Sequence, residues 1–359
     1  MPATQLLYQA TLDSLHDNTT RAAIINGHAD PLLKEIGRQC AQLTILQHFK
    51  PLHDELLRLN FSCPHNLEGE FDLILLTPSK NKQQTLGWMA GAMHHLADDA
   101  RLMIGCANRH GAKSYEAALK KLAGNTRSSS KSKCRIFSAR KSSSFNTELA
   151  RQWINEAQPR RVESHGLVSQ PGLFSWEKVD TGSQLLLTYL PADLHGRGMD
   201  LCCGYGLLSE RLLKTSPDIE TLHLADADRL ALACAKQNTM PWQDRVVAHW
   251  LDAVTEPLPP KLDWIVCNPP FHTGQDQDIA SGQSIIANSC KSLKRGGRLY
   301  MVANRKLPYE ATLDRMLMNH RTVVQEQGFK IIEATKGAGQ STWQRTAGTE
   351  GWDYDYDRK

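Results

Sequence analysis

The sequence lacks the long apolar segments that membrane proteins carry. In 359 residues, no apolar run approaches the roughly 18 residues that a membrane-spanning helix needs. The first 15 residues mix polar and apolar side chains and lack the apolar core of a secretion signal. We therefore expect a cytoplasmic protein with no membrane partner.

Paired cysteine spacings are also missing. The nine cysteines are scattered, and no two of them have the Cys-x-x-Cys spacing of zinc or redox sites. They are Cys40, Cys63, Cys106, Cys134, Cys202, Cys203, Cys234, Cys267 and Cys290. We expect reduced, mostly buried thiols and no bound metal.

Excess charge is small, since the net charge is +4, but cations crowd one serine-rich stretch. These basic residues are Arg127, Lys131, Lys133, Arg135, Arg140, Lys141, Arg160 and Arg161. The stretch could lie against phosphate or simply be a solvated loop. With 41% hydrophobic residues the chain can bury a large core, and its length favours two domains.

Two apolar segments that run into a proline loop resemble each other. Residues 71–78 align with residues 262–269 at an offset of 191. Downstream, residues 100–109 parallel residues 297–305, where matching the asparagines near their ends gives an offset of 196. Because the order of segments is the same in both halves, the sequence indicates an internal duplication.

Each half also has a helical stretch between these two strands, at residues 84–96 and 280–293. Strands that alternate with helices predict a parallel sheet with helices on both faces. We therefore expect two related α/β domains that join near residues 140–165.

Only the second copy keeps residues suited to chemistry. Residues 200–206 contain a Gly-x-Gly turn that residues 23–30 of the first copy lack. Likewise, Asn-Pro-Pro-Phe at residues 268–271 becomes Thr-Pro-Ser-Lys at residues 77–80. We infer an inert N-terminal copy and an active C-terminal one.

Several residues of the second copy favour nucleoside binding. Gly204 and Gly206 let the backbone approach a ligand, although such a turn alone is also common in loops. Asp226 ends the next strand and could accept both ribose hydroxyls, or else cap the following helix. Asp252 could accept the adenine amino group, or else be a loop or cap residue.

The loop at Asn268 gives the sharpest signal in the chain. The side-chain oxygen of Asn268 and the carbonyl of Pro269 can accept the two N–H bonds of a planar amine, in a geometry that the prolines hold rigid. Phe271 can stack on the attached base, which is worth about 1–3 kcal/mol. Pro270 and His272 would then border the substrate.

This pattern resembles the class I methyltransferases and, within them, the ribosomal RNA guanine-N2 methyltransferases of the RsmC type. The resemblance covers residues 10–337. Its specific segments are residues 171–175 with 180–187, 200–206, 268–272, and 302–304 with 307–309. That family has a tandem duplication with a degenerate first domain.

The resemblance implies two tandem Rossmann-like class I methyltransferase domains. Residues 1–160 would be the degenerate domain, for RNA binding or structural support, and residues 161–337 the catalytic domain. Residues 338–359 would form a disordered tail. The implied reaction moves a methyl group from S-adenosyl-L-methionine to N2 of a guanine in 16S rRNA of the small ribosomal subunit, catalysed by a monomer.

Within this resemblance, Asp200, Gly204, Gly206, Asp226 and Asp252 would bind the cofactor. Asn268, Pro269 and Phe271 would be catalytic, and Pro270, His272 and Arg305 would bind substrate. Cys202 departs from the family pattern, which has glycine there, so cofactor affinity could be lower.

The chemistry follows from what Asn268 cannot do. An amide cannot abstract a proton, so we expect no general base before attack. His272 could take the proton afterwards or be structural. Arg305 and the basic stretch near residue 135 are candidates for holding RNA phosphates.

Other functions stay open at this point. Similar loops serve enzymes that methylate adenine N6 or a glutamine amide, and a large-subunit guanine is an alternative acceptor. A non-catalytic RNA-binding assembly factor is a different class, as is a dehydrogenase. The latter lacks support because Ser209 replaces the third glycine of Gly-x-Gly-x-x-Gly.

Overall fold

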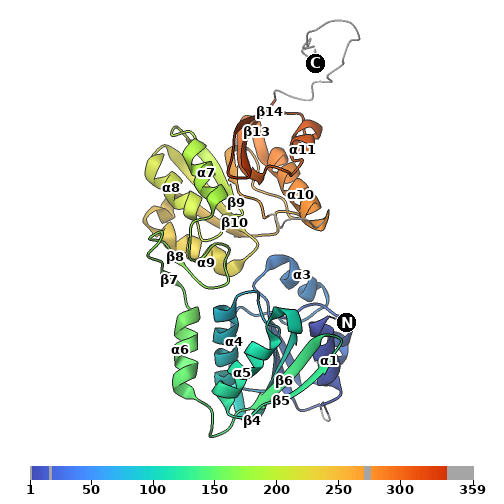
Figure 1. The fold of residues 1–359 in the computed structure, drawn as a ribbon. Helices are drawn as coiled ribbons and strands as arrows, with labels where there is room; N and C mark the ends of the chain where they lie inside the picture. The colour runs from blue at the N-terminus through green and yellow to red at the C-terminus, as the bar shows by residue number, and fades with distance from the viewer. Residues whose placement is uncertain (1, 16–17, 271–275, 338–359) are drawn as a thin grey trace, which may run out of the picture. The chain divides into compact units, whose positions relative to one another are not determined.

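The computed structural model describes residues 2–15, 18–270 and 276–337. The chain divides into two compact units (Figure 1). The N-terminal unit comprises Met1–Glu177 with Asp228–Leu230, and the C-terminal unit comprises Lys178–Ala227 with Ala231–Lys359. Each is an α/β unit, which confirms the predicted architecture.

The described residues of the N-terminal unit form a sheet with the strand order β2-β1-β3-β4-β6-β5. β1 to β4 are parallel, whereas β6 runs antiparallel to β4 and to β5. The strands are β1 (Arg21–Ile25), β2 (Gln42–Leu46), β3 (Phe71–Leu76), β4 (Leu96–Ala107), β5 (Arg127–Lys131) and β6 (Cys134–Arg140). The helices are α1 (Ala3–Leu12), α2 (Pro31–Arg38), α3 (Lys50–Arg58), α4 (Lys82–His95), α5 (Ala112–Ala123) and α6 (Thr147–Ala157).

The C-terminal unit repeats this order with one more strand, as β11-β10-β9-β12-β13-β15-β14. Its strands are β9 (Gly196–Leu201), β10 (Ile219–Asp226), β11 (Val246–Trp250), β12 (Leu262–Cys267), β13 (Leu293–Asn304), β14 (Met318–Glu326) and β15 (Phe329–Lys336). Its helices are α7 (Thr181–Tyr189), α8 (Leu207–Thr215), α9 (Arg229–Asn238), α10 (Asp276–Ser292) and α11 (Glu310–Arg315). A small separate sheet pairs β7 (Arg160–Arg161) with β8 (Val168–Ser169).

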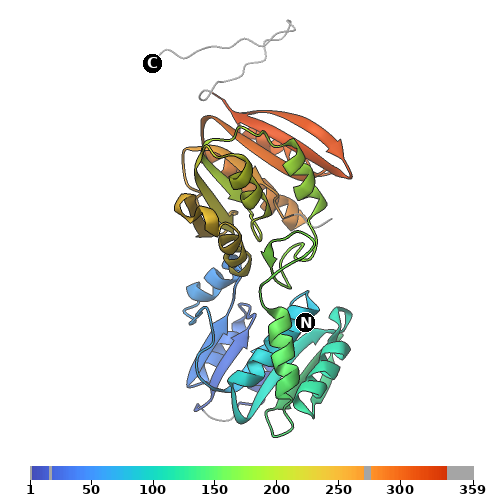
Figure 2. The ribbon, with the colours of Figure 1, turned by 90° about the vertical axis from the view of Figure 1, so that its left-hand side faces the viewer.

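Each sheet is covered by helices on both faces, so each unit has a core on either side of its sheet (Figure 2). In the N-terminal unit, α4, α5 and α6 pack on one face and α1, α2 and α3 on the other. In the C-terminal unit, α10 and α11 cover one face and α7, α8 and α9 the other. Buried strands of this kind read as nearly continuous apolar runs, as Phe71–Leu76 does.

Side-chain caps fix where several helices begin. Asp30, Asn81 and Asn146 each accept a hydrogen bond from a backbone N–H in the first turn of α2, α4 and α6. Asp180 does the same for α7. These polar residues satisfy donors that the first helical turn leaves without partners.

No helix among the described residues is long and apolar enough to cross a membrane.

The duplication is visible strand by strand. β3 and β12 correspond at the expected offset of 191, since Phe71 pairs with Leu96 as Leu262 pairs with Leu293. The same pairs show that β4 and β13 correspond at an offset of 197, so the value of 196 was wrong. Matching the two asparagines misplaced one residue, because Asn304 ends β13 where Ala107 ends β4.

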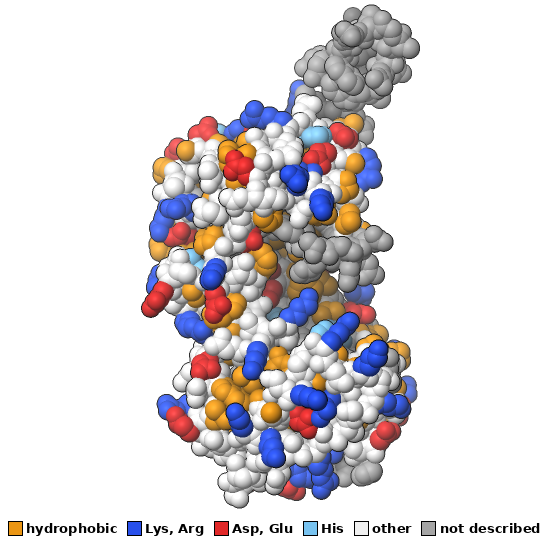
Figure 3. Space-filling model, viewed as in Figure 1, with side chains coloured by type: hydrophobic (Ala, Val, Ile, Leu, Met, Phe, Trp, Pro, Cys, Tyr) orange, Lys and Arg blue, Asp and Glu red, His pale blue; other side chains and the backbone are white. Residues whose placement is uncertain are grey.

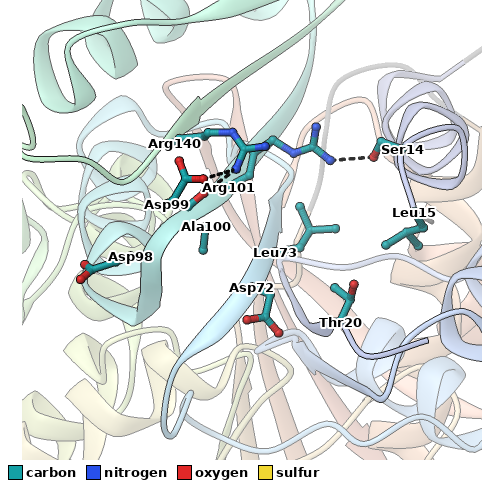
Figure 4. Close-up of a pocket in the computed structure, with 10 residues that line it drawn as sticks. All are labelled: Ser14, Leu15, Thr20, Asp72, Leu73, Asp98, Asp99, Ala100, Arg101 and Arg140. Carbon is teal, nitrogen blue, oxygen red and sulfur yellow. Dashed lines mark hydrogen bonds and ion pairs between the residues drawn. The ribbon is translucent and has the colours of Figure 1, made fainter. Parts of the chain in front are cut away.

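Both copies keep the same hydrogen bond at the amino end of the sheet. The carboxylate of Asp72 accepts the backbone N–H of Arg21 at 2.8 Å, and Asp263 accepts that of Arg197 at 2.7 Å. Asp72 borders a hollow in which Asp99 and Arg140 form an ion pair (Figure 4). This end of the sheet therefore carries interactions that serve the architecture.

Both copies also have an ion pair between a strand and a helix at corresponding positions. The strand is β6 in the N-terminal unit and β15 in the C-terminal unit, and the helix is the one that follows β4 or β13. Arg135 of β6 pairs with Glu116 of α5. At the corresponding position of β15, the ammonium group of Lys330 lies 2.6 Å from Glu310 of α11 and also donates to the carbonyl of Leu307. These pairs add to the structural correspondence between the two units.

Candidate active site

The glycine turn connects β9 to α8 in the C-terminal unit. Cys202, Gly204 and Gly206 all have positive φ, at 60°, 54° and 84°. A Cβ built on Gly204 would meet no atom within 4 Å, so the backbone there borders open space. Cys202 adopts the left-handed conformation although it has a side chain, and Asn26 does so at the matching position after β1 (φ 56°).

Asp226 is hydrogen-bonded to this turn. Its carboxylate accepts the backbone N–H of Gly204 at 2.8 Å, from the carboxyl end of β10. The capping bond to the start of α9 comes instead from Asp228, which accepts the N–H of Leu230 at 2.8 Å. The structure thus brings together the two features that the sequence separates by 20 residues.

Asp200 lies fully buried in β9. One carboxylate oxygen accepts the backbone N–H of Ser209 at 3.0 Å and also its hydroxyl group, which ties β9 to α8. The other oxygen has no partner among the described residues. Burial, with a further contribution from the charge of Asp226, raises the pKa of Asp200 to about 7.

Asp252 is occupied within its own loop. Its carboxylate accepts the backbone N–H of Val254 at 2.9 Å and the hydroxyl of Thr255 at 2.7 Å. This is the capping geometry that the sequence left open as an alternative. Contact of Asp252 with an adenine stays a prediction.

Asn268 follows β12 directly and is held by two anchors. Its amide NH₂ group donates to Asp180 at 3.0 Å and to the hydroxyl of Ser183 at 2.8 Å. Because both N–H bonds are used, the amide oxygen is left to accept a hydrogen bond from a substrate. Pro269 is buried and Pro270 exposed, so the loop leaves the sheet at this point.

Asp180 and Ser183 are the residues that the sequence did not identify as part of the site. They lie at the start of α7, where Asp180 also caps the helix by accepting the N–H of Ser183 at 2.8 Å. An Asp-x-x-Ser spacing signals a helix start. It does not reveal that the same carboxylate reaches a loop 88 residues away.

The remaining predicted site residues are Phe271, predicted to be catalytic, and His272 and Arg305, predicted to bind substrate. Phe271 and His272 lie outside the described residues. Arg305 is exposed in the turn after β13, where its backbone N–H donates to Gly328 at 2.9 Å. Their roles stay predictions.

The basic stretch divides between structural and exposed cations. Arg135 pairs with Glu116, Arg140 with Asp99, and the ammonium of Lys141 donates to the carbonyl of Leu96 at 2.6 Å. Arg127, Lys131 and Lys133 remain exposed on the β5–β6 hairpin. Arg160 stacks on Trp176, with its guanidinium 4.9 Å from the ring centre.

The N-terminal unit has lost the corresponding site. By strand register, Gln47 stands where Asp226 does, and it is buried. Its amide donates to the carbonyl of Gly27 at 2.8 Å and accepts from the backbone of Phe49 at 3.0 Å. The position that corresponds to Asp226 is thus occupied by an amide whose hydrogen bonds are made within the N-terminal unit.

Comparisons with known proteins identify the family of both halves of the chain. The family "Methyltransferase small domain" matches residues 164–333, and "Methyltransferase small domain N-terminal" matches residues 13–157. A relative named ribosomal RNA small subunit methyltransferase C, from Psychromonas ingrahamii, is 30% identical over 80% of this chain and 82% of its own. One from Photorhabdus laumondii is 30% identical over 74% of this chain and 77% of its own.

The fold matches a solved structure over nearly its whole length. A T. thermophilus 16S rRNA N2 methyltransferase, in complex with AdoMet and guanosine, superposes with a TM-score of 0.76 at 21% identity. The match covers 94% of this chain and 92% of that one. This match shows the fold. The curated relatives, at 30% identity over more than two thirds of their length, show that this chain belongs to the ribosomal RNA small subunit methyltransferase C family.

Proposed function

We propose that this chain transfers a methyl group from S-adenosylmethionine to the exocyclic N2 of a guanine in 16S rRNA. The observation that carries the proposal is the anchored amide of Asn268, which presents an oxygen and no basic group to an amine acceptor. Relatives named as small-subunit methyltransferases favour 16S rRNA over a large-subunit guanine. The neighbour solved with guanosine favours guanine over adenine.

The residues of the glycine turn fit S-adenosylmethionine. Gly204 borders open space, and Asp226 stands beside it at the end of β10, where a ribose is bound in folds of this kind. The unpartnered oxygen of buried Asp200 suits a cationic group nearby. Bound there, the cofactor supplies a methyl group made electrophilic by its sulfonium sulfur.

The acceptor loop prepares the nucleophile. The amide oxygen of Asn268 and the carbonyl oxygen of Pro269 accept the two N–H bonds of the guanine amine. These two bonds orient the nitrogen lone pair toward the methyl donor and weaken its conjugation with the ring. Positioning of this kind can remove about 7–11 kcal/mol from a barrier.

Proton loss follows transfer in this scheme. The amine nitrogen becomes positively charged only once the new bond forms, so its proton leaves readily to water. His272, which follows Phe271 in the sequence, is the candidate side chain for accepting this proton. Phe271 would stack on the extruded base and offset part of the few kcal/mol that extrusion costs.

The cellular setting is part of the same proposal. We infer that the enzyme acts in the cytoplasm, as a monomer, on rRNA within the small subunit. Residues 161–337 would carry the chemistry, and residues 1–160 would support it and contact RNA. Arg305, exposed beside β13, would contact phosphate.

Replacing Asn268 with Ala tests the proposal. The variant should lose methyl transfer to 16S rRNA by a factor of at least 100, because the acceptor amine is no longer oriented. Its affinity for S-adenosylmethionine, measured by calorimetry, should stay at the wild-type value. Transfer of a radiolabelled methyl group and nucleoside analysis of the product as N2-methylguanosine provide the readout.

Two further variants sharpen this test. Asn319→Ala makes the same chemical change at an exposed position of β14 and should retain full activity. Ser183→Ala removes one anchor of the amide and should lower kcat about 2- to 12-fold, the value of one hydrogen bond. Normal turnover by Asn268→Ala would refute the assigned role.

A further inference from the structure

The N-terminal unit has a hollow of about 980 Å³ at the carboxyl ends of β3 and β4. The β5–β6 turn and the first residues of α1 complete its walls. The volume is in the range of pockets that bind small molecules or nucleotides. Basic side chains are spread over the visible face of this unit (Figure 3).

The hollow occupies the place that the acceptor site has in the second copy. Thr77 follows β3 as Asn268 follows β12, at the offset of 191. By the same offset, Lys80 stands where the sequence has Phe271. An amide that accepts hydrogen bonds is thus replaced by a hydroxyl, and a base-stacking ring by an ammonium group.

A second cation reaches the hollow from a backbone position that suits glycine. Ser132 and Lys133 form the β5–β6 turn with φ of 51° and 59°. The matching β14–β15 turn has Gln327 and Gly328, with φ of 50° and 83°. The left-handed conformation is unfavourable for lysine but readily adopted by glycine. The backbone at Lys133 is therefore strained where the matching turn, with Gly328, is not.

The electrostatics of the hollow favour an anion. Lys80, Arg109 and Lys133 are exposed along its wall. Among the described residues, none forms an ion pair with these three cations, and none that lines the hollow carries a carboxylate. The hydroxyl oxygen of Thr77 is buried without a partner in the same described part of the chain.

We propose that this hollow, the former acceptor pocket of the first copy, binds a phosphodiester group of the RNA substrate through Lys80, Arg109 and Lys133. The inference rests on the proposed function and names where its substrate is held away from the reacting guanine. A base is disfavoured because His110 is the only aromatic ring among the described residues of the lining. A phosphate instead matches the donors that replaced Asn268 and Phe271.

The double substitution Lys80→Ala with Lys133→Gly, made in the full chain, tests the proposal. Lys133→Gly removes the cation and relieves the turn, so the melting temperature should not fall. The dissociation constant for a 16S rRNA transcript, measured by filter binding, should rise about 10-fold or more. The slope of log affinity against log salt should become shallower by about 0.7 for each phosphate that the variant no longer neutralises.

Lys131→Ala is the matched control, because Lys131 lies exposed on the same hairpin but outside the lining. Its affinity and salt slope should stay near the wild-type values. Equal losses of affinity in the control and the double variant would refute binding at the pocket, and would show instead a nonspecific attraction between RNA and the basic surface. Wild-type affinity and slope in the double variant would overturn it as well.

Binding of RNA alone separates this inference from the proposed function. If the wild-type chain fails to transfer methyl groups or to bind S-adenosylmethionine, the proposed function fails. The pocket is then still judged by the filter-binding result. If the wild-type chain methylates 16S rRNA while the double variant binds it normally, only the pocket is refuted.

Discussion

The carboxyl group of Asp200 should make stability depend on pH. Burial raises its pKa from 3.8 to about 7 in the folded chain, so the folded state favours the protonated form. The contribution of Asp200 to the free energy of unfolding is complete below pH 3.8 and is lost as the pH rises through about 7. Between these values the free energy of unfolding should fall by about 1.4 kcal/mol per pH unit from this group alone.

Urea unfolding of wild type and Asp200→Asn between pH 5 and 7 measures this effect. The asparagine keeps an acceptor for Ser209 but does not titrate. The difference between the two free energies of unfolding should therefore shift steadily with pH. A constant difference would show that Asp200 is ionised throughout.

Single residues also show what the sequence could and could not reveal. The role proposed for Asn268 could be inferred because the Asn-Pro-Pro-Phe loop is a local pattern, shared by enzymes that methylate several kinds of planar amine. Asp180 and Ser183 were missed because their hydrogen bonds with Asn268 span more than 80 residues and leave no trace in local spacing. The substitution at Gln47 could not be found for a similar reason, since only strand register shows that its position corresponds to that of Asp226.

Among the secondary-structure elements, the ion pair between β15 and α11 should be a strong stabilising interaction. Lys330 is 5% exposed, and its ammonium donates to Glu310 and to the carbonyl of Leu307. Lys330→Met would leave Glu310 and this carbonyl without their donor. Because Glu310 is partly open to water, we expect a loss of about 2–3 kcal/mol, somewhat less than the roughly 3–5 kcal/mol of a fully buried pair.

A double-mutant cycle with Glu310→Gln isolates this pair. The double variant should recover part of the stability that Lys330→Met loses, because no unpaired charge remains. Denaturant midpoints of the four chains give the coupling energy. Strictly additive effects would show that the two side chains do not interact.

Element boundaries were less predictable than element order. The expected helices at 84–96 and 280–293 correspond to α4 (Lys82–His95) and α10 (Asp276–Ser292). Their order and type followed from the alternation of apolar strands with helical stretches. The first residue of α4 depended on a cap, the side chain of Asn81 accepting from the backbone of Gln84, which periodicity does not show.

On the scale of the whole molecule, we expect one cofactor site per chain. The C-terminal unit has the glycine turn with Asp226, whereas the N-terminal unit has Gln47 bonded to Gly27 in the same place. Calorimetric titration with S-adenosylmethionine should give a stoichiometry of one. Asp226→Ala should abolish the signal rather than halve it.

Gln47→Asp is the informative control for this stoichiometry. It restores the carboxylate but not the glycine turn, so a second site should not appear. Two equivalents bound by the wild-type chain, or a residual site in Asp226→Ala, would contradict the assignment of the N-terminal unit as inert toward the cofactor.

The edge of the N-terminal sheet limits what a substitution could restore in that unit. Where the second copy has β11, the described residues of the first keep a single bridge between Thr44 and Ser62. With that strand gone, the wall that carries Asp252 in the second copy has no counterpart to rebuild. We therefore expect that no single substitution restores a cofactor site in the N-terminal unit.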